Sequence, residues 1–410
     1  MGELERILRE GVALHESGRY DDALALYDDA LSRWPTLALL WNNRGNTFLE
    51  LGFLDQAVKS YQHALELAPS LHDSRVALAS CLQAQGDLQQ AMVECARVLK
   101  AAPDHAEAHW NYALLMLLQG NYVNGFREYE WRWKKRRFTS PLREFAEPRW
   151  YGGDLVGKTI LVYAEQGLGD TLQFCRYVPL LVQRGAKVVF ECHQPLARLM
   201  ETLGSGISVV PFGGQLPSFD CHIPLLSIPY LLGSTLETIP TTVPYLHVPE
   251  ERRPFWQSVI PSARRARKIG ICWAGKSKPD PARSCPPELL QPLADLHGIA
   301  WVSLQVGQGD AKPGFPLIDL AMLLQDFSDT AALVEQLDLV IAIDTSVAHL
   351  AGALGKQTWL LVPFAPDWRW GAERSDCPWY PTMRLFRQPA PADWESVVRE
   401  VAAEVQRWSG

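Results

Sequence analysis

Three prolines mark a fixed period in the first third of the chain. Pro35, Pro69 and Pro103 are spaced by 34 residues, and each follows a segment with the same pattern of small and aromatic residues. The matching positions are Gly11, Tyr20, Ala23, Tyr27 and Ala30, then Trp41, Gly45, Phe48, Ala57, Tyr61 and Ala64, then Ala79, Leu82, Ala91, Cys95 and Val98. A spacing kept at so many positions predicts stacked repeats that bury their apolar faces against their neighbours.

These positions resemble the tetratricopeptide repeat, in which small residues let two antiparallel helices approach closely and large residues fill the space between pairs. A degenerate further copy runs from about His105 to Tyr129. We therefore expect about four helical hairpins in residues 1–137. The resemblance implies a concave face that binds a protein or peptide.

Composition excludes two classes of partner. The formal net charge of −7 gives no strong basic field for a phosphate backbone, so we expect no nucleic acid. No apolar run reaches the roughly 18 residues of a membrane span, and the charged start "MGELERILREG" is unlike a signal peptide. We expect a cytoplasmic protein without a membrane span.

Strands and helices alternate in the remainder of the chain. A Pro- and Gly-rich stretch, 138–157, is interpreted as a linker, and a second one at 249–267 separates two alternating regions, 158–248 and 268–390. The predicted strands are 159–164, 187–192, 207–211, 269–274, 300–306, 339–343 and 358–362, and the predicted helices of the first region are 170–183 and 195–203. This order predicts two Rossmann-like α/β domains. Residues 391–410 are expected to form an amphipathic helix that can cross back onto the first of them.

The stretch "VIAIDTSVAHLAGALGKQTWLLVP", 340–363, is typical of strand, helix and strand. Asp344 or Thr345 is a natural N-cap, and the amides of the helix start attract anions such as phosphate. Thr345 and Ser346 can add hydroxyl donors, and His349 lies one turn later on the same face. The alternative is a capped helix with a satisfied histidine.

The stretch "AEQGLGD", 164–170, places a glycine turn between a strand and a helix. Gly167 and Gly169 allow close backbone approach beside Gln166, and Asp170 lies near the helix start. The motif lacks the third glycine of the dinucleotide fingerprint. Asp170 is either a functional carboxylate or simply an N-cap.

The second α/β region begins in the same way. A strand ends near Trp273 and Gly275, and Lys276, Lys278 and Arg283 follow in the loop. Cations at the carboxyl end of a strand are well placed to neutralise a diphosphate. An ordinary exposed basic loop is the alternative.

"PFAPDWRWG", 363–371, follows the last of these strands and is expected on the same rim. Its residues Asp367, Trp368 and Arg369 suit a lid or a base-stacking platform, or only a packed loop.

Together, the repeats, "YEWRW", "AEQGLGDTLQF", "GICWAG", "ARS", "DTSVAHLAGALGK" and "PFAPDWRWG" resemble bacterial tetratricopeptide-repeat proteins fused to a heptosyltransferase-like glycosyltransferase. The resemblance implies the GT-B fold, with the acceptor on the first Rossmann-like domain and the sugar nucleotide on the second. It also implies a general base at Asp170 and a diphosphate site at Asp344, Thr345, Ser346 and His349. The loop after Gly275 departs from the family pattern and keeps only Arg283 and the serine after it.

The predicted function is inverting transfer of a sugar from a nucleotide-sugar to a protein or glycan acceptor that the repeats present. The donor site would comprise Trp273, Gly275, Lys276, Arg283, Asp344, Thr345, Ser346 and His349, facing Gln166, Gly167, Gly169 and Asp170. No D-x-D motif stands at a strand end, so we expect neither a metal nor a cofactor besides the donor. The alternatives are a non-catalytic scaffold and a sugar-nucleotide epimerase of the same fold.

Overall fold

The computed structural model describes residues 2–136, 138–260, 266–276, 281–307 and 311–409. They form two compact units, Met1–Phe138 and Thr139–Gly410. In these ranges no helix combines the length and the apolar character that crossing a bilayer requires.

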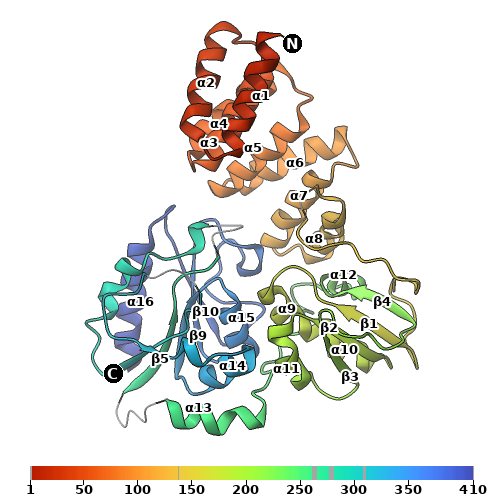
Figure 1. Ribbon diagram of the computed structural model, residues 1–410, viewed down its shortest axis with the longest axis vertical. Helices are drawn as coiled ribbons and strands as arrows, with labels where there is room; N and C mark the ends of the chain where they lie inside the picture. Colours follow the sequence, from red (N-terminus) through yellow and green to blue (C-terminus); the bar gives the residue numbers. More distant parts are fainter. Residues whose placement is uncertain (1, 137, 261–265, 277–280, 308–310, 410) are drawn as a thin grey trace. The chain divides into compact units, whose positions relative to one another are not determined.

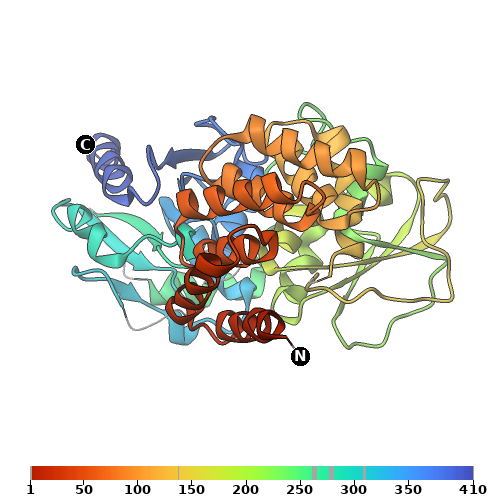
Figure 2. The ribbon, with the colours of Figure 1, turned by 90° about the horizontal axis from the view of Figure 1, so that it is seen from above.

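The first unit is a series of antiparallel helix pairs (Figure 2). The helices are α1 (Glu3–Glu16), α2 (Tyr20–Arg33), α3 (Ala38–Glu50), α4 (Leu54–Leu67), α5 (His72–Ala84), α6 (Leu88–Ala101), α7 (Ala106–Leu118) and α8 (Tyr122–Tyr129), followed by the 3₁₀ turn η1 (Glu130–Lys134). Each pair is the hairpin that the 34-residue period predicts, and the prolines stand just after the second helix of the pair.

Small residues bring the two helices of a pair together. A Cβ atom on Gly11 would lie 2.4 Å from Tyr27 Cε1, and one on Gly45 would lie 2.8 Å from Tyr61 Cε1. Both tyrosines are fully buried, so the ring occupies the space that the missing side chain leaves. The spacing of glycine and tyrosine in the sequence is therefore a packing rule of the repeat.

The second unit begins with a parallel sheet in the order β3-β2-β1-β4. The strands are β1 (Thr159–Tyr163), β2 (Lys187–Cys192), β3 (Ile207–Pro211) and β4 (Cys221–Pro224). Its helical segments are α9 (Leu168–Phe174), η2 (Cys175–Tyr177), α10 (Val178–Gln183), η3 (Gln194–Leu196), α11 (Ala197–Met200), η4 (Glu201–Leu203), η5 (Leu225–Ser227) and α12 (Ile228–Leu231). The two helices expected at 170–183 and 195–203 are each broken by 3₁₀ turns, and Pro179 lies in the first turn of α10.

The stretch 138–157 is not a free linker, contrary to expectation. Trp150 and Leu155 are buried, and Arg149 forms a parallel bridge with His222 of β4. The prolines and glycines of this stretch limit regular structure but do not prevent packing. The segment therefore belongs to the first α/β domain.

The second sheet is also parallel, in the order β10-β9-β8-β5-β6-β7. Its strands are β5 (Arg267–Cys272), β6 (Ile299–Ser303), β7 (Ile318–Asp319), β8 (Leu339–Ile343), β9 (Thr358–Val362) and β10 (Met383–Arg387). Its helical segments are η6 (Glu250–Arg252), α13 (Arg253–Val259), η7 (Pro281–Arg283), η8 (Pro287–Leu293), η9 (Ala321–Leu323), α14 (Phe327–Glu335), α15 (Ser346–Ala353), η10 (Trp368–Trp370) and α16 (Trp394–Ser409).

Two other segments also differ from expectation. The stretch 249–267 contains α13, whose Trp256 is fully buried and donates to Asp329 of α14 over 3.1 Å; residues 261–265 of it lie outside the described ranges. The C-terminal helix α16 does not cross back to the first sheet. Its buried stripe, which includes Trp394, Val398 and Val401, joins the core of the second sheet (Figure 1).

Candidate functional site

The order of strands in each sheet marks where a ligand can bind. In the first sheet the order reverses beside β1, and in the second it reverses beside β5 and β8. In doubly wound sheets ligands bind outside the carboxyl ends of the strands at such reversals. The glycine turn follows β1, the basic loop follows β5, and Asp344 follows β8, so all three motifs stand at the reversals.

Helices α9 and α15 bring the two reversals together (Figure 1). A Cβ atom on Gly169 of α9 would lie 2.9 Å from His349 Cδ2 and 3.7 Å from Ser346 Cα of α15. Any larger residue at 169 would push the two helices apart. The start of the helix that carries Asp170 therefore directly contacts the start of the helix that carries the "DTSVAH" motif.

Both oxygens of Asp170 are engaged in this structure. The Gly167 N–H donates to Oδ2 over 2.9 Å, so Asp170, in the first turn of α9, binds the amide of the N-cap residue Gly167. The Arg369 guanidinium donates to Oδ1. Gly167, and not Asp170, is therefore the N-cap of α9, and the Asp170 side chain also forms an ion pair with the other α/β domain.

Arg369 is buried and makes hydrogen bonds to both domains. Besides Asp170, it donates to Gln173 Oε1 of α9 and, over 2.9 Å, to Asp367 Oδ1. Its guanidinium carbon lies 4.6 Å from the centre of the Trp368 ring. Trp368 is only 4% exposed, so its ring is packed and does not offer a base-stacking platform.

Asp344 lies in surroundings that oppose its ionisation. Burial and the neighbouring Asp367 carboxylate raise the pKa of Asp344 to about 6, and Arg369 and Arg283 lower it by a smaller amount. A carboxylate here would repel a diphosphate. Asp344 is suited instead to accept hydrogen bonds from hydroxyl groups, such as those of a sugar.

His349 does not point freely at a ligand, contrary to expectation. It is buried, its Nδ1 lies 2.9 Å from the Tyr380 hydroxyl, and its ring stacks on Trp370 with centroids 5.2 Å apart. Burial, Arg369 and Arg176 hold the pKa of His349 well below its usual value of 6.5, so the ring is neutral at pH 7. It supports the α9–α15 contact and supplies no positive charge.

Thr345 and Ser346 keep the geometry that the motif predicts. Thr345 is the N-cap of α15 in an extended conformation, and its hydroxyl donates to the Ile343 carbonyl over 3.3 Å. The first amides of a helix have no partner within it. Both residues are partly exposed, so these amides can meet an anion.

The start of the basic loop after β5 is anchored by Gln305, a residue that the sequence motifs did not reveal. Gln305 accepts from the Trp273 and Ala274 amides over 3.2 and 3.0 Å and donates to the Ala274 carbonyl over 3.0 Å. Trp273 itself is a core residue at 3% exposure, so its side chain does not reach a donor as predicted. A single glutamine after β6 carries no sequence signal of this role.

Arg283 lies across Gly275. A Cβ atom on Gly275 would be 3.0 Å from Arg283 Nε, and Arg283 Nη2 donates to the Lys276 carbonyl over 3.0 Å. Lys276 is exposed. Lys278 lies outside the described residues.

The glycine turn is clamped by two residues outside its motif. Gln166 has a left-handed backbone with φ 62°, a conformation that costs free energy for a residue with a side chain. The Ser140 hydroxyl accepts from its N–H over 2.7 Å, and His193 Nε2 lies 3.2 Å from its carbonyl while Nδ1 lies 3.1 Å from the Thr171 hydroxyl. Burial lowers the pKa of His193. The position of His193 just after β2 is the one feature of the sequence that indicates its place at the candidate site.

Arg176 also joins the two domains. It is buried and donates to the Trp379 and Pro240 carbonyls over 2.6 and 2.8 Å and to the Tyr245 hydroxyl over 2.8 Å. Its guanidinium also lies 4.6 Å from the centre of the Tyr380 ring. It therefore stiffens the contact that Asp170 and Arg369 make.

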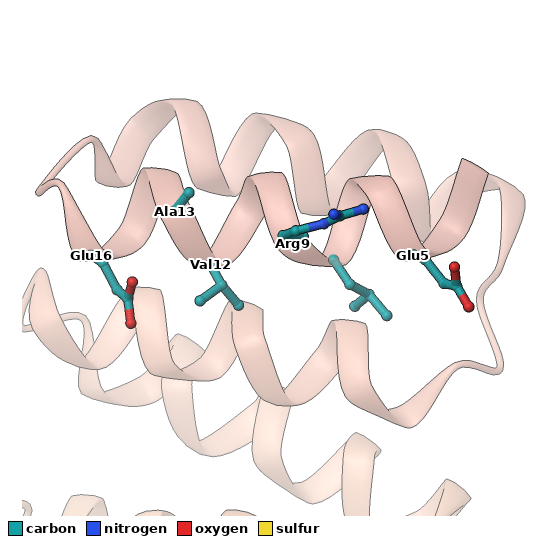
Figure 3. Close-up of a pocket in the computed structure, with 6 residues that line it drawn as sticks. Glu5, Arg9, Val12, Ala13 and Glu16 are labelled. Carbon is teal, nitrogen blue, oxygen red and sulfur yellow. The ribbon is translucent and has the colours of Figure 1, made fainter. Parts of the chain in front are cut away.

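Two hollows on the described surface lie away from these residues. One of about 520 Å³ lies along α1 (Figure 3) and is lined by Glu5, Leu8, Arg9, Val12, Ala13 and Glu16. Another, of about 700 Å³, lies beside Trp359, Arg384 and Trp408. In the described ranges no three His, Cys, Asp or Glu side chains gather as metal ligands.

The architecture is therefore an α-solenoid joined to a pair of Rossmann-like domains in the GT-B manner, with the two domains in contact at their strand reversals. Family models described as "Tetratricopeptide repeat" match residues 48–110 and, separately, 8–38 and 95–130. These matches confirm the repeats.

Protein FlbA of Caulobacter vibrioides is 26% identical over 426 residues, which cover 96% of this chain and 71% of FlbA. Among solved structures, a glycosyl transferase family 9 protein from Veillonella parvula is 14% identical with a TM-score of 0.47, covering 64% of this chain and 100% of that one. The ADP-heptose lps heptosyltransferase II of E. coli is 14% identical with a TM-score of 0.43, covering 61% of this chain and 98% of that one.

Proposed function

We propose that the protein is a glycosyltransferase that moves a sugar, with inversion and without a metal, from a nucleotide-sugar to an acceptor hydroxyl. One observation carries the proposal: α9, with the carboxylate of Asp170, meets the open amides of α15 at the joined strand reversals of two parallel sheets. A base and an anion site on opposite sides of one contact are what such a transfer needs.

The roles follow from the chemistry of each group. Asp170 takes the proton of the acceptor hydroxyl as the oxygen forms a bond to the anomeric carbon. The bond from that carbon to the diphosphate oxygen breaks, and the nucleoside diphosphate leaves with the electron pair. The amides and hydroxyls of Thr345 and Ser346, with Lys276 and Arg283, meet its charge, and Asp344 accepts hydrogen bonds from the sugar.

The test is a melting-temperature screen of the purified protein with UDP-, GDP- and ADP-sugars. A specific donor should raise the melting temperature, because a ligand that binds only the folded state stabilises it. With that donor, Asp170→Asn should slow transfer by about two to four orders of magnitude, the usual effect of losing a general base. The matched control is Asp376→Asn, whose carboxylate is 70% exposed and pairs with Arg374.

The proposal also predicts that EDTA leaves transfer intact, because amides and cations meet the leaving group in place of a divalent ion. Rates would be compared before and after dialysis against EDTA and after adding back Mg²⁺ or Mn²⁺. A strict requirement for either ion would contradict this part of the mechanism.

The repeats are proposed to hold the acceptor, a protein or a glycan. A non-catalytic scaffold is the second candidate, and the observation that favours it is that both oxygens of Asp170 are already engaged. A scaffold would bind none of the three classes of donor, so the screen separates the two candidates.

A further inference from the structure

We propose that Arg369 is the cation that receives the diphosphate of the donor, and that its ion pair with Asp170 is the blocked resting form of the base. This inference rests on the proposed function. It explains why the carboxylate expected to act as a base is engaged in the ligand-free structure.

The contacts of Arg369 divide between the two domains. On the first domain it donates to Asp170 Oδ1 and Gln173 Oε1, and on its own domain it donates to Asp367 Oδ1 over 2.9 Å. Asp367 also accepts from the Arg369 amide over 3.0 Å, so the root of the side chain is anchored to its own loop. The guanidinium can therefore change partner on the first domain while it keeps its anchor on the second.

The charge around this contact suits an incoming anion. Arg369 and Arg283 lower the pKa of the Asp344 carboxyl, and Arg369 and Arg176 lower the pKa of His349. Lys276 lowers the pKa of His193. Arg369 pairs with Asp170 and Asp367, and Arg369 and Arg283 both lie near Asp344. A diphosphate at the start of α15 would lie among the cations, and the planar fork of a guanidinium binds phosphate as well as it binds carboxylate.

The exchange has a definite order. When the diphosphate arrives, Arg369 Nη2 turns from Asp170 Oδ1 to a phosphate oxygen. Oδ2 stays with the Gly167 N–H, and the freed Oδ1 takes the proton of the acceptor hydroxyl. After transfer the nucleoside diphosphate leaves, Asp170 loses the proton to water, and the ion pair forms again. The base is thus available only when the donor is in place.

The test is calorimetric titration of UDP, GDP and ADP into the full-length protein and its variants. Asp170→Asn should bind the nucleotide about ten-fold more tightly than the wild type, although its transfer is slow, because Arg369 no longer has to leave a carboxylate. Arg369→Gln should bind at least about ten-fold more weakly, and Arg369→Lys should fall between because it keeps the charge but not the fork. Arg399→Gln, which breaks an exposed ion pair with Glu395 on α16, is the matched control and should bind as the wild type does.

Tighter nucleotide binding by Asp170→Asn is the decisive result, because breaking a merely structural ion pair would weaken nucleotide binding. Unchanged or weaker binding by Asp170→Asn overturns the proposal, whether or not Arg369→Gln folds. Binding to Asp170→Asn alone, and not to the wild type, would support it. If no nucleotide binds the wild type or any variant, the proposed function fails and this inference fails with it. If the wild type transfers the sugar but Asp170→Asn binds the nucleotide with unchanged affinity, only the exchange is rejected.

Discussion

Burial beside a second carboxyl group changes the ionisation of Asp344. Its pKa rises from the ordinary 3.8 to about 6 because it is buried beside Asp367, and the cations Arg369 and Arg283 compensate only in part. A raised pKa means that the folded protein favours the protonated form. The stabilisation associated with that proton is complete below about pH 4 and is lost as the pH rises through about 6.

We therefore predict that Asp344→Asn stabilises the protein at pH 7.5 but not at pH 4. The amide cannot ionise, so the free energy of unfolding should increase at neutral pH by on the order of 1–3 kcal/mol, the free energy that corresponds to the raised pKa of the carboxyl. Urea denaturation at both pH values measures it, with Asp376→Asn as an exposed control. An equal effect at the two pH values would show that ionisation is not the cause.

At the scale of elements, the contact between α9 and α15 controls the site. Gly169 lies against His349, and His349 is wedged between Trp370 and Tyr380, so the ring has little room to move. Alanine ordinarily favours a helix over glycine by about 1 kcal/mol. Here the steric conflict should outweigh that gain.

We predict that Gly169→Ala lowers the free energy of unfolding by about 1–3 kcal/mol, the usual cost of overpacking, and impairs transfer. The same change in a His349→Ala background should cost clearly less, because the conflicting ring is gone. Gly153→Ala is the control, since a Cβ atom there meets nothing within 4 Å. Additive effects of the two substitutions would mean that the helices do not meet as described.

At the scale of the whole molecule, the two units have separate cores and separate proposed tasks. The buried residues of the repeats form clusters of their own, around Tyr27 and around Tyr61, and the second sheet has its own cluster with α16. The division at Phe138 leaves Ser140, which holds the Gln166 amide, with the α/β unit. The α/β unit should therefore keep its site without the repeats.

We predict that a chain of residues 139–410 keeps donor binding and slow donor hydrolysis but loses transfer to the acceptor, because only the repeats hold that acceptor close. Hydrolysis and transfer would be measured side by side with the full-length protein. If both activities fall equally while the shortened chain remains folded, the repeats do not present the acceptor. The Ser140→Ala variant of the full-length protein tests separately whether the glycine turn depends on this residue.

The sequence alone determined the features that depend on local patterns. The 34-residue period defined the helical hairpins, and short apolar runs located β2, β3, β8 and β9 at the bounds that the structure has. The same patterns placed Asp170, Thr345 and Ser346 at helix starts that follow strands, because a strand followed by a helix start is a local signal.

Only the tertiary structure decided which side chains meet. Asp170 and Arg369 are 199 residues apart in the chain, and nothing local to either one specifies the other. For the same reason the sequence could not show that Trp273 is in the core, that His349 is neutral and buried, or that α16 packs on the second sheet. Burial and ionisation depend on the groups that folding brings close, and that long-range packing leaves no periodicity in the sequence.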